Sequence, residues 1–241
     1  MKLSIIVPCY NEGEKILKNA ELIIKKMKEL DIDYNITIVN DGSTDNTLSF
    51  LNQIKYPNTY IESYEKNRGK GYAVKYGIQS LFKNNREGDY INFMDADLST
   101  NLDAINTTLR YCDNLNFDVI IGSRRHENTI LPKPQKLPRK IIGKMCIIIT
   151  KLIIGLDVSD TQCGFKTFKS DIMKYIIEKQ QIERFAFDVE YLYIAKLKNK
   201  TIKEIPIVWE NDEDSKVSAV KSSIRFFKDL FIIRKNKKKY L

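Results

Sequence analysis

The sequence contains a single histidine, His126, and its four cysteines lack the C-x-x-C spacing of a zinc site. A histidine-rich metal cluster is therefore excluded, and a Ser-His-Asp triad would depend on this one imidazole. The scattered cysteines, which are Cys9, Cys112, Cys146 and Cys163, do not suggest a disulfide framework. This pattern fits a protein of the reducing cytosol.

Long hydrophobic runs are also missing. The apolar stretch near the N-terminus is broken by Pro8, so it is better interpreted as a first core strand than as a signal peptide. The most apolar segment, residues 140–158, contains Lys144 and Lys151 and falls short of the roughly 18 to 20 apolar residues that a spanning helix needs. We expect this segment to be a core helix or a helix on a membrane surface, and not to cross a bilayer.

Positive charge, by contrast, is abundant. The 241 residues carry a formal net charge of +9, which favours nucleic acid, a phosphorylated ligand or an acidic membrane surface as partner. The densest basic run is RKNKKKYL near the C-terminus, and the sequence has no motif of alternating aromatic and basic residues of the kind that forms a nucleic-acid platform. A nucleic-acid-binding module is therefore the weakest hypothesis, and we expect no nucleic acid partner. The basic run itself is expected to be mobile.

Short apolar runs alternate with helix-like segments through the first half of the chain. Residues 3–7, 35–39, 59–64, 90–94 and 118–122 predict strands, and residues 12–30, 43–54, 71–82 and 101–112 predict helices. This alternation predicts an α/β fold with a central, mostly parallel sheet flanked by helices, in one domain over residues 1–230. Each strand run ends in turn-forming residues. These loops should form one rim at the carboxyl ends of the strands, where ligands bind.

The fourth strand run leads directly into Asp95-Ala96-Asp97. Carboxylates two residues apart on extended backbone point the same way, and such an oxygen pair suits a divalent cation that bridges to phosphate. The alternative is that these acids and the polar residues after them cap the next helix. The residues alone fit both interpretations.

Two other rim loops have residues suited either to turns or to phosphate. In VNDGSTD, Asp41 and Gly42 fit a tight turn, and the residues that follow fit a helix cap. In KNRGKGYAV, glycines and cations precede a helix and offer backbone N–H groups and positive charge to a phosphate. The second motif is not a P-loop, because G-x-x-x-x-G-K-[ST] is absent.

Taken in order, the motifs SIIVPCYNE, VNDGSTDNT, NRGKGYAV and MDADLS resemble those of the family 2 glycosyltransferases, which have a GT-A fold. The second half has IIGSRR, LPRKIIGK, DTQCGFKTFK, FAFDVEYLYIAK and EIPIVWENDEDSKVS. It is similar to the polyprenyl- and dolichyl-phosphate sugar synthases, particularly the dolichyl-phosphate β-glucosyltransferase branch. The resemblance implies transfer of a hexose, preferably glucose from UDP-glucose, to dolichyl or polyprenyl phosphate with inversion.

The resemblance also implies a donor site. It assigns the nucleotide sugar to Pro8, Tyr10, Asn11, Glu12, Asp41, Lys70, Asp95, Ala96 and Lys216. Asp41 would read the uracil imide, and Lys216 would lie in a loop that closes on the diphosphate. Asp95 and Asp97 would hold Mg²⁺ or Mn²⁺, which neutralises the leaving diphosphate.

The implied catalytic residues are Asp97, Asp160, Asp188 and Glu190, and the implied acceptor-phosphate residues are Arg124, Arg125 and Arg139. A lipid phosphate is already ionised and needs no strong general base, whereas a saccharide acceptor would make Asp188 or Glu190 essential. A solvated basic surface and a helix-dipole role are the structural alternatives for the arginines and for these two acids. The chain departs from the family pattern at Asn40, where an acid is common, and at Ser99, where a glutamine often contacts the metal.

Two other enzymes remain as alternatives: a GDP-mannose-dependent polyprenyl-phosphate mannosyltransferase and a family 2 transferase with a saccharide acceptor. A lipid acceptor implies a cytoplasmic enzyme that is peripheral on the cytosolic face of a membrane. Residues 217–241 combine aromatic, aliphatic and basic side chains. This composition is typical of an amphipathic anchor on an anionic membrane surface.

Overall fold

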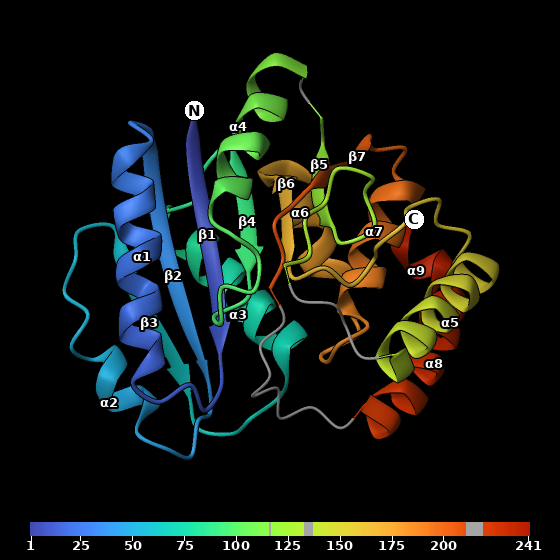
Figure 1. Ribbon diagram of the computed structural model, residues 1–241, viewed down its shortest axis with the longest axis horizontal. Coiled ribbons are helices and arrows are strands. Elements are labelled where there is room, and N and C mark those ends of the chain that lie inside the picture. The colour runs from blue at the N-terminus through green and yellow to red at the C-terminus, as the bar shows by residue number, and fades with distance from the viewer. Residues whose placement is uncertain (116, 133–136, 211–218) are drawn as a thin grey trace.

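The computed structural model describes residues 1–115, 117–132, 137–210 and 219–241, with only the backbone at Asn114, 137–142 and 219–224. The described residues form a seven-stranded sheet in the order β3-β2-β1-β4-β6-β5-β7 (Figure 1). The strands are β1 (Lys2–Cys9), β2 (Asp33–Asp41), β3 (Thr59–Tyr64), β4 (Tyr90–Met94), β5 (Val119–Ser123), β6 (Phe165–Lys169) and β7 (Ile202–Pro206). β6 is antiparallel to both of its neighbours, and the other pairs are parallel. The predicted mostly parallel sheet is confirmed.

Helices cover both faces of the sheet. One face carries α1 (Lys15–Glu29), α2 (Thr47–Leu51) and α4 (Asp103–Leu115). The other carries α3 (Lys70–Lys83), α5 (Leu137–Ile154), α6 (Ser170–Lys179), α7 (Phe187–Leu197), α8 (Ala219–Lys235) and α9 (Lys237–Tyr240). The predicted order of strands and helices in the first half is therefore confirmed.

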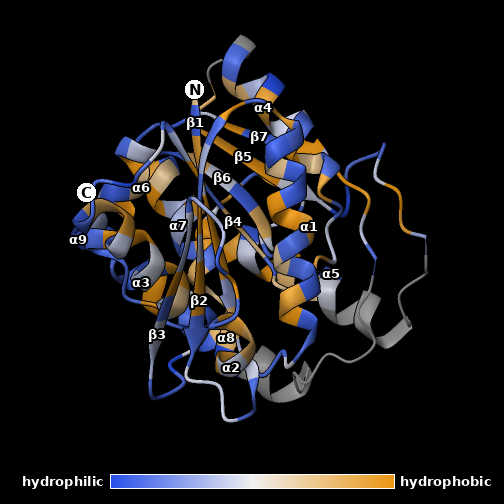
Figure 2. Ribbon diagram, turned by 90° about the vertical axis from the view of Figure 1, so that its left-hand side faces the viewer, coloured by the Kyte–Doolittle hydropathy of each residue, from blue (hydrophilic) through white to orange (hydrophobic). Residues whose placement is uncertain are grey.

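Strand β1 shows why both faces are covered. Ile5 and Val7 pack into the core beneath α1, whereas Ile6 packs into the core beneath α3. Successive side chains of a strand point to opposite faces, so a strand buried on both sides is apolar at nearly every position. Figure 2 shows the same arrangement: hydrophobic residues concentrate in the central strands, and α1 carries both hydrophobic and hydrophilic residues.

The carboxyl ends of β1, β2, β3 and β4 lie together at the lower edge of the sheet in Figure 1. β5 ends at the same edge, because it is antiparallel to β6, which is itself antiparallel to β4. The predicted rim of loops therefore exists. We call the loops at this edge the rim.

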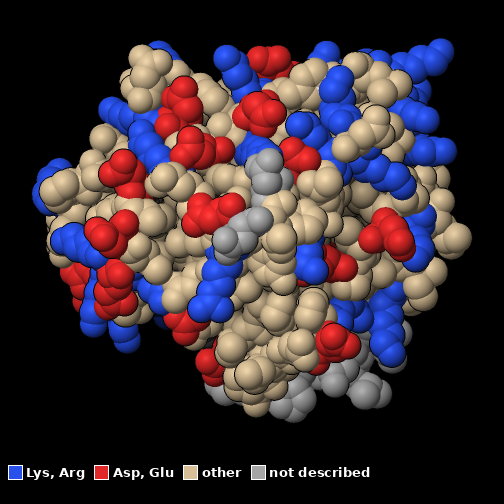
Figure 3. Space-filling view, turned by 90° about the horizontal axis from the view of Figure 1, so that it is seen from above, with Lys and Arg blue, Asp and Glu red and all other residues tan. Residues whose placement is uncertain are grey.

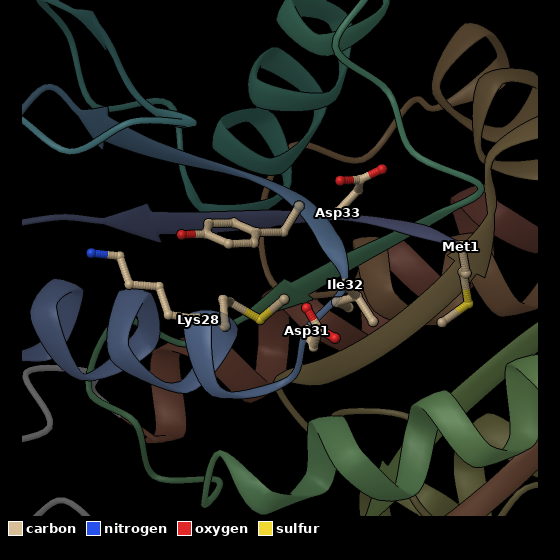
Figure 4. A pocket seen from close by; sticks show the side chains of 7 residues that line it. Met1, Lys28, Asp31, Ile32 and Asp33 are labelled. Atoms are coloured by element: carbon tan, nitrogen blue, oxygen red, sulfur yellow. The ribbon is translucent and has the colours of Figure 1, made fainter.

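A pocket lies at the opposite edge of the sheet. Its lining is Met1, Met27, Lys28, Asp31, Ile32, Asp33 and Tyr34, from the amino ends of β1 and β2 and the end of α1 (Figure 4). Figure 3 views the molecule from this side and shows acidic and basic side chains intermixed, with basic ones denser toward the side of α5, α8 and α9. Ligands of open α/β sheets bind at the carboxyl ends of strands, so this pocket is not the expected site.

The C-terminal segment is a packed element, contrary to the expected mobile run. Helix α8 packs against α5, and its side chains Phe226, Leu230 and Ile233 are buried. Tyr240 is 0% exposed, and its hydroxyl donates a hydrogen bond to Glu190. The expectation was wrong because apolar residues at helical spacing among the lysines give this segment one face that the core covers.

We predict that Leu230→Ala lowers the free energy of unfolding by about 2 to 5 kcal/mol, because it removes a fully buried side chain from the core. Ile232→Ala on the same helix is the matched control, since Ile232 is 44% exposed, and its effect should stay within about 0.5 kcal/mol. Chemical denaturation of both variants measures the difference. Equal effects would contradict the packing of α8.

Candidate functional site

The loops after β1 and β2 are joined by hydrogen bonds. Asn11 has a left-handed φ of 56°, and its Oδ1 accepts the Thr44 N–H at 2.8 Å. The Asn11 N–H donates to Ser43 Oγ at 3.0 Å. The other predicted donor-site residues of this segment are Pro8, Tyr10 and Glu12. Pro8 is buried at the end of β1 and Tyr10 is exposed. The segment therefore begins in the core and presents an accessible aromatic ring.

Asp41, at the end of β2, organises the loop between β3 and α3. Its Oδ1 accepts the Tyr64 hydroxyl at 2.8 Å and the Arg68 N–H at 2.8 Å. Its Oδ2 accepts the Asn67 amide at 2.9 Å and the Gly69 N–H at 3.0 Å. Burial raises the pKa of Asp41, and the hydrogen bonds from Arg68, Tyr64 and Gly69 act in the opposite direction.

These contacts bear on the predicted role of Asp41 at a nucleobase. A carboxylate offers about four lone-pair sites, and the residues of its own loop already use the Asp41 oxygens. A uracil imide would have to share one of these oxygens. The nucleobase role therefore stays a prediction, whereas the loop-organising role is seen directly.

The acid pair follows β4. Asp95 forms an ion pair with the ammonium of Lys70, in the first turn of α3, and Asp97 Oδ1 accepts the Ser99 N–H at 2.9 Å. Partial removal from water and the charge of Asp95 raise the pKa of Asp97, although its side chain reaches the surface. The intervening Ala96 is buried, and its carbonyl accepts the Asn19 side-chain amide at 2.8 Å.

The acid pair fits a divalent cation by its chemistry. Hard oxygen ligands suit Mg²⁺ and Mn²⁺, and a cation would stabilise the charged form of Asp97, whose pKa is raised by burial and by the charge of Asp95. Within the described ranges, no group of three or more His, Cys, Asp or Glu side chains could hold a metal. A cation here would therefore complete its shell with phosphate oxygens and water, which Mg²⁺ readily retains.

A buried ion pair lies behind Asp95. Lys166 of β6 is 2.6 Å from Asp188 of α7, and both side chains are almost fully enclosed. Gly164 allows Asp95 to approach this wall, because a Cβ at that position would lie 1.8 Å from Asp95 Oδ2. Burial raises the pKa of Asp188, and Lys166 and Lys70 oppose that shift.

Lys70 connects the acid pair to the buried pair. Burial alone would lower its pKa, but the charges of Asp95 and Asp188 outweigh burial, so that the Lys70 pKa is raised. Lys70 is therefore a permanent cation among three carboxylates, since Asp97 raises its pKa as well. It lies at the N-terminal end of α3, where the helix dipole adds positive potential.

Arg124 and Asp160 form the other side of the rim. The guanidinium donates from Nε to Oδ2 at 2.7 Å and from Nη2 to Oδ1 at 2.8 Å, and the Arg124 N–H also reaches Oδ2. Although burial raises the pKa of Asp160, Arg124 outweighs burial and lowers this pKa to about 2. The two residues, predicted for different roles, thus form one bidentate pair, and Asp160 is a poor proton acceptor.

Glu190 does not join this cluster, and its predicted catalytic role stays a prediction. It lies two residues after Asp188 on α7, and positions two apart on a helix point in nearly opposite directions. Its carboxylate is 0% exposed and accepts hydrogen bonds from Gln181, Ile182 and Tyr240. The acid is committed to the interior of the protein.

The remaining predicted residues are placed as follows. Arg125 follows Arg124, has an exposed side chain, and its N–H donates to Ser123 Oγ at 3.3 Å. Arg139 lies in the first turns of α5, where only the backbone is described. Lys216 lies outside the described residues. Their predicted roles stay predictions.

Several residues of the site were not predicted individually. They are Tyr64, Asn67 and Arg68, which hold Asp41, and Lys166, which holds Asp188. Lys166 had a signal in the sequence: it stands between apolar residues in the strand run FKTF, where an inward-facing lysine needs a buried partner. The hydrogen bonds to Asp41 had none, because they depend on the loop conformation.

We predict that Asp160→Asn lowers the free energy of unfolding by about 3 kcal/mol near neutral pH, because it leaves Arg124 without its partner. The Asp160 pKa is depressed in the folded state, so its stabilisation is present above the unfolded pKa of about 4. It is lost as pH falls from about 4 to about 2. Denaturation of wild type and variant across this range should therefore show a shrinking difference. A constant difference would contradict the charged pair.

Solved structures with similar folds include glucosyl-3-phosphoglycerate synthase from Mycobacterium tuberculosis in complex with Mn²⁺, UDP and glucosyl-3-phosphoglycerate. It aligns with a TM-score of 0.68 and 13% identity, over 97% of this chain and 79% of that chain. Residues 1–349 of TarS from S. aureus, in complex with UDP-GlcNAc, align with a TM-score of 0.59 and 17% identity, over 96% and 67% of the two chains. At these identities the likeness concerns the fold.

Curated relatives are more similar in sequence. The dolichyl-phosphate beta-glucosyltransferase of Dictyostelium discoideum is 32% identical over 96% of this chain and 73% of that protein. The proteins of the same name from Saccharomyces cerevisiae and Homo sapiens are 33% and 30% identical, over 96% and 97% of this chain and 74% and 75% of theirs. The model of the family described as Glycosyl transferase family 2 matches residues 4–176. The chain is therefore a member of glycosyl transferase family 2.

Proposed function

We propose that this protein transfers glucose from UDP-glucose to dolichyl or polyprenyl phosphate and forms a β-linked lipid phosphate sugar. The name shared by its relatives supports the sugar and the acceptor. The observation that carries the proposal is the division of the rim. An acid pair with Lys70 lies on one side and a bidentate Arg124–Asp160 pair on the other.

On the donor side, Asp95 and Asp97 would hold Mg²⁺ or Mn²⁺, and the bound cation supplies Lewis-acid neutralisation of the leaving diphosphate. Lys70 adds a second positive charge next to Asp95. The N-terminal end of α3 adds the positive end of its helix dipole to the same region. These residues together would stabilise the negative charge that develops on the diphosphate.

The acceptor follows from the state of the acids. A phosphate monoester has its second pKa near about 6, so its attacking oxygen is ionised at neutral pH without help from a base. Asp188 is held in a buried pair with Lys166, and the Asp160 pKa is about 2. Because Asp160 is a weak proton acceptor and Asp188 is enclosed in its ion pair with Lys166, the site favours a phosphate acceptor over a saccharide hydroxyl.

Attack by the lipid phosphate on the face of the sugar opposite the diphosphate would invert the anomeric carbon. An α-linked nucleotide sugar would then give a β-linked product. Arg124 follows the last residue of β5, and the charges of Asp160 and, to a smaller extent, Asp95 raise its pKa. It would therefore stabilise phosphate charge near the reacting centre.

The direct test is transfer from a panel of radiolabelled UDP-glucose, UDP-GlcNAc and GDP-mannose to polyprenyl phosphate in the presence of Mn²⁺. We expect label from UDP-glucose to enter the organic phase as a lipid phosphate sugar that is stable to alkali and cleaved by acid. We expect little label from the other two donors. Transfer from GDP-mannose alone would replace the proposed donor. Transfer only to a saccharide would overturn the proposed acceptor.

Within this assay, Asp97→Asn should reduce transfer at least about 100-fold, because it removes a charged ligand of the cation. Asp103→Asn is the matched control. Asp103 is an exposed acid at the start of α4, where it forms an ion pair with Lys26 of α1. The control should keep near-normal transfer, and excess EDTA should reproduce the loss in wild type. Full activity of Asp97→Asn would remove the metal assignment.

A lipid acceptor requires contact with a membrane surface, and helices α5 and α8 together form a candidate surface for that contact. No helix among the described residues is long and apolar enough to cross a bilayer. On α5, however, Met145, Ile148 and Leu152 are exposed at helical spacing, and Leu152 is 79% exposed. Exposed Phe231 and Ile232 extend the apolar residues onto the adjacent α8. The exposed cations Lys144, Lys151, Lys228 and Lys235 accompany these residues.

An amphipathic surface of this kind lies in the headgroup region, with apolar side chains inserted and cations attracted to anionic lipid. The proposed anchor is therefore the α5–α8 surface as a whole, wider than the expected segment 217–241. The α8 core positions described above serve the fold, and the outward positions would serve the membrane.

We expect the double variant Ile148→Asp with Leu152→Asp to bind vesicles of phosphatidylserine and phosphatidylcholine at least about tenfold more weakly, because each exposed side chain would lose about 1.5 kcal/mol of apolar burial. Leu115→Asp is the control, since Leu115 is similarly exposed on α4 at the other face of the sheet. Cosedimentation at low and high salt measures binding. If both variants bind as wild type does, this surface is not the anchor.

A further inference from the structure

Glu190 is a fully buried acid with no part in the proposed chemistry. Its Oε1 accepts the Gln181 N–H at 2.8 Å and the Tyr240 hydroxyl at 2.6 Å, and its Oε2 accepts the Ile182 N–H at 3.0 Å. Burial raises the pKa of Glu190, because a charged carboxylate in an apolar core is unfavourable without such donors.

The backbone that Glu190 holds belongs to residues 180–184, which we call the strap. The strap contacts the first turn of α3 at two points. The Gln180 side-chain amide donates to the Gly71 carbonyl at 3.0 Å, and the Tyr72 N–H donates to the Glu183 carbonyl at 2.9 Å. Gly71 is required at this contact, since a Cβ there would lie 2.9 Å from the Arg184 carbonyl oxygen and 2.7 Å from Phe187 Cβ.

The first turn of α3 is the part of the rim that would face the diphosphate. Lys70 reaches from it to Asp95, and the N–H groups of Arg68 and Gly69 immediately before it bind Asp41. A shift of this turn would move the cation and the loop that Asp41 organises at the same time. The strap packs against this turn through both backbone and side-chain contacts.

On its other side, Glu190 is connected to the C-terminal helix α9 through Tyr240. The Tyr240 ring is buried, and the Tyr175 hydroxyl donates to the Tyr240 carbonyl at 2.9 Å. A second link within the core joins the Tyr191 hydroxyl to Gln180 Oε1 at 2.7 Å and so fixes the side chain that holds Gly71. An unbroken set of contacts therefore runs from Tyr240 through Glu190 and the strap to α3.

We propose that Glu190, held by Tyr240, is a positioning residue that keeps the strap against the first turn of α3 and thereby sets the diphosphate-binding geometry of Lys70. The assignment rests on the proposed donor site for its effect on catalysis. Its effect on the conformation of the turn does not depend on the identity of the substrate. Glu190 acts through the strap and touches no substrate.

The first experiment measures the turn itself, without any nucleotide. Glu190→Gln preserves size but replaces one acceptor oxygen by an NH₂ group that faces backbone N–H donors. Tyr240→Phe removes only the hydroxyl. Amide hydrogen exchange of the segment 68–76, which includes the Tyr72 N–H, should become about tenfold faster in Glu190→Gln and faster by a smaller factor in Tyr240→Phe. Exchange of β1 and β2 should stay unchanged.

The matched control is Tyr193→Phe. Tyr193 lies on the same helix as Glu190, its ring is buried beside Tyr240, and its hydroxyl accepts a hydrogen bond from Arg234 of α8 at 3.2 Å. The substitution thus removes one bond between α7 and the C-terminal segment without touching Glu190. It should lower the melting temperature slightly and leave exchange of residues 68–76 as in wild type.

The second experiment measures donor and acceptor constants in the transfer assay. A positioning role predicts a donor KM raised about fivefold or more in Glu190→Gln, an acceptor KM within twofold of wild type, and the same pattern at smaller size in Tyr240→Phe. If the transfer assay itself fails, the exchange result still decides the conformational part. Unchanged exchange of residues 68–76 in Tyr240→Phe, or equal acceleration in Tyr193→Phe, overturns the proposal even if Glu190→Gln does not fold.

Discussion

The balance of charge around Lys70 is the constraint on which the rest of the rim depends. Three carboxylates, those of Asp95, Asp97 and Asp188, act on this one ammonium, and Lys166 neutralises Asp188 from behind. An unpaired charge in such a partly desolvated site would cost several kcal/mol of folding free energy. The acids can therefore gather only because α3 and β6 bring cations to the same edge. This explains why motifs far apart in the chain belong together.

The same constraint separates acids that would bind charge from acids that hold structure. Burial and the charge of Asp95 raise the pKa of Asp97 and Lys70 opposes this shift, so a further positive charge would stabilise this carboxylate. Asp160 is already satisfied by Arg124, and Glu190 by N–H and O–H donors. Residue type alone does not divide these groups. Their partners do.

Sequence patterns were sufficient for features that depend on local periodicity. The strand runs, the helices between them and the rim followed from alternation and from turn residues, and the acid pair followed from its position after an apolar strand. The antiparallel β6 and the packed α8 could not be predicted, because both depend on which distant segments meet. The separation of Glu190 from Asp188 was not predicted for a related reason: the motif FDVE gives two acids, and only the helical conformation shows that they face opposite sides.

The position of β6 also has a consequence for the order in which the protein can fold. Strands β1 to β4 are encoded before residue 95 and pair directly with one another, so this half of the sheet can form early during synthesis. β5 is made next but has no place beside β4, because β6 lies between them and is translated about 40 residues later. Until then β4 is an edge strand, open to wrong partners. A chaperone that transiently covers the β4 edge would therefore aid the newly made chain more than one that covers a surface of the folded protein.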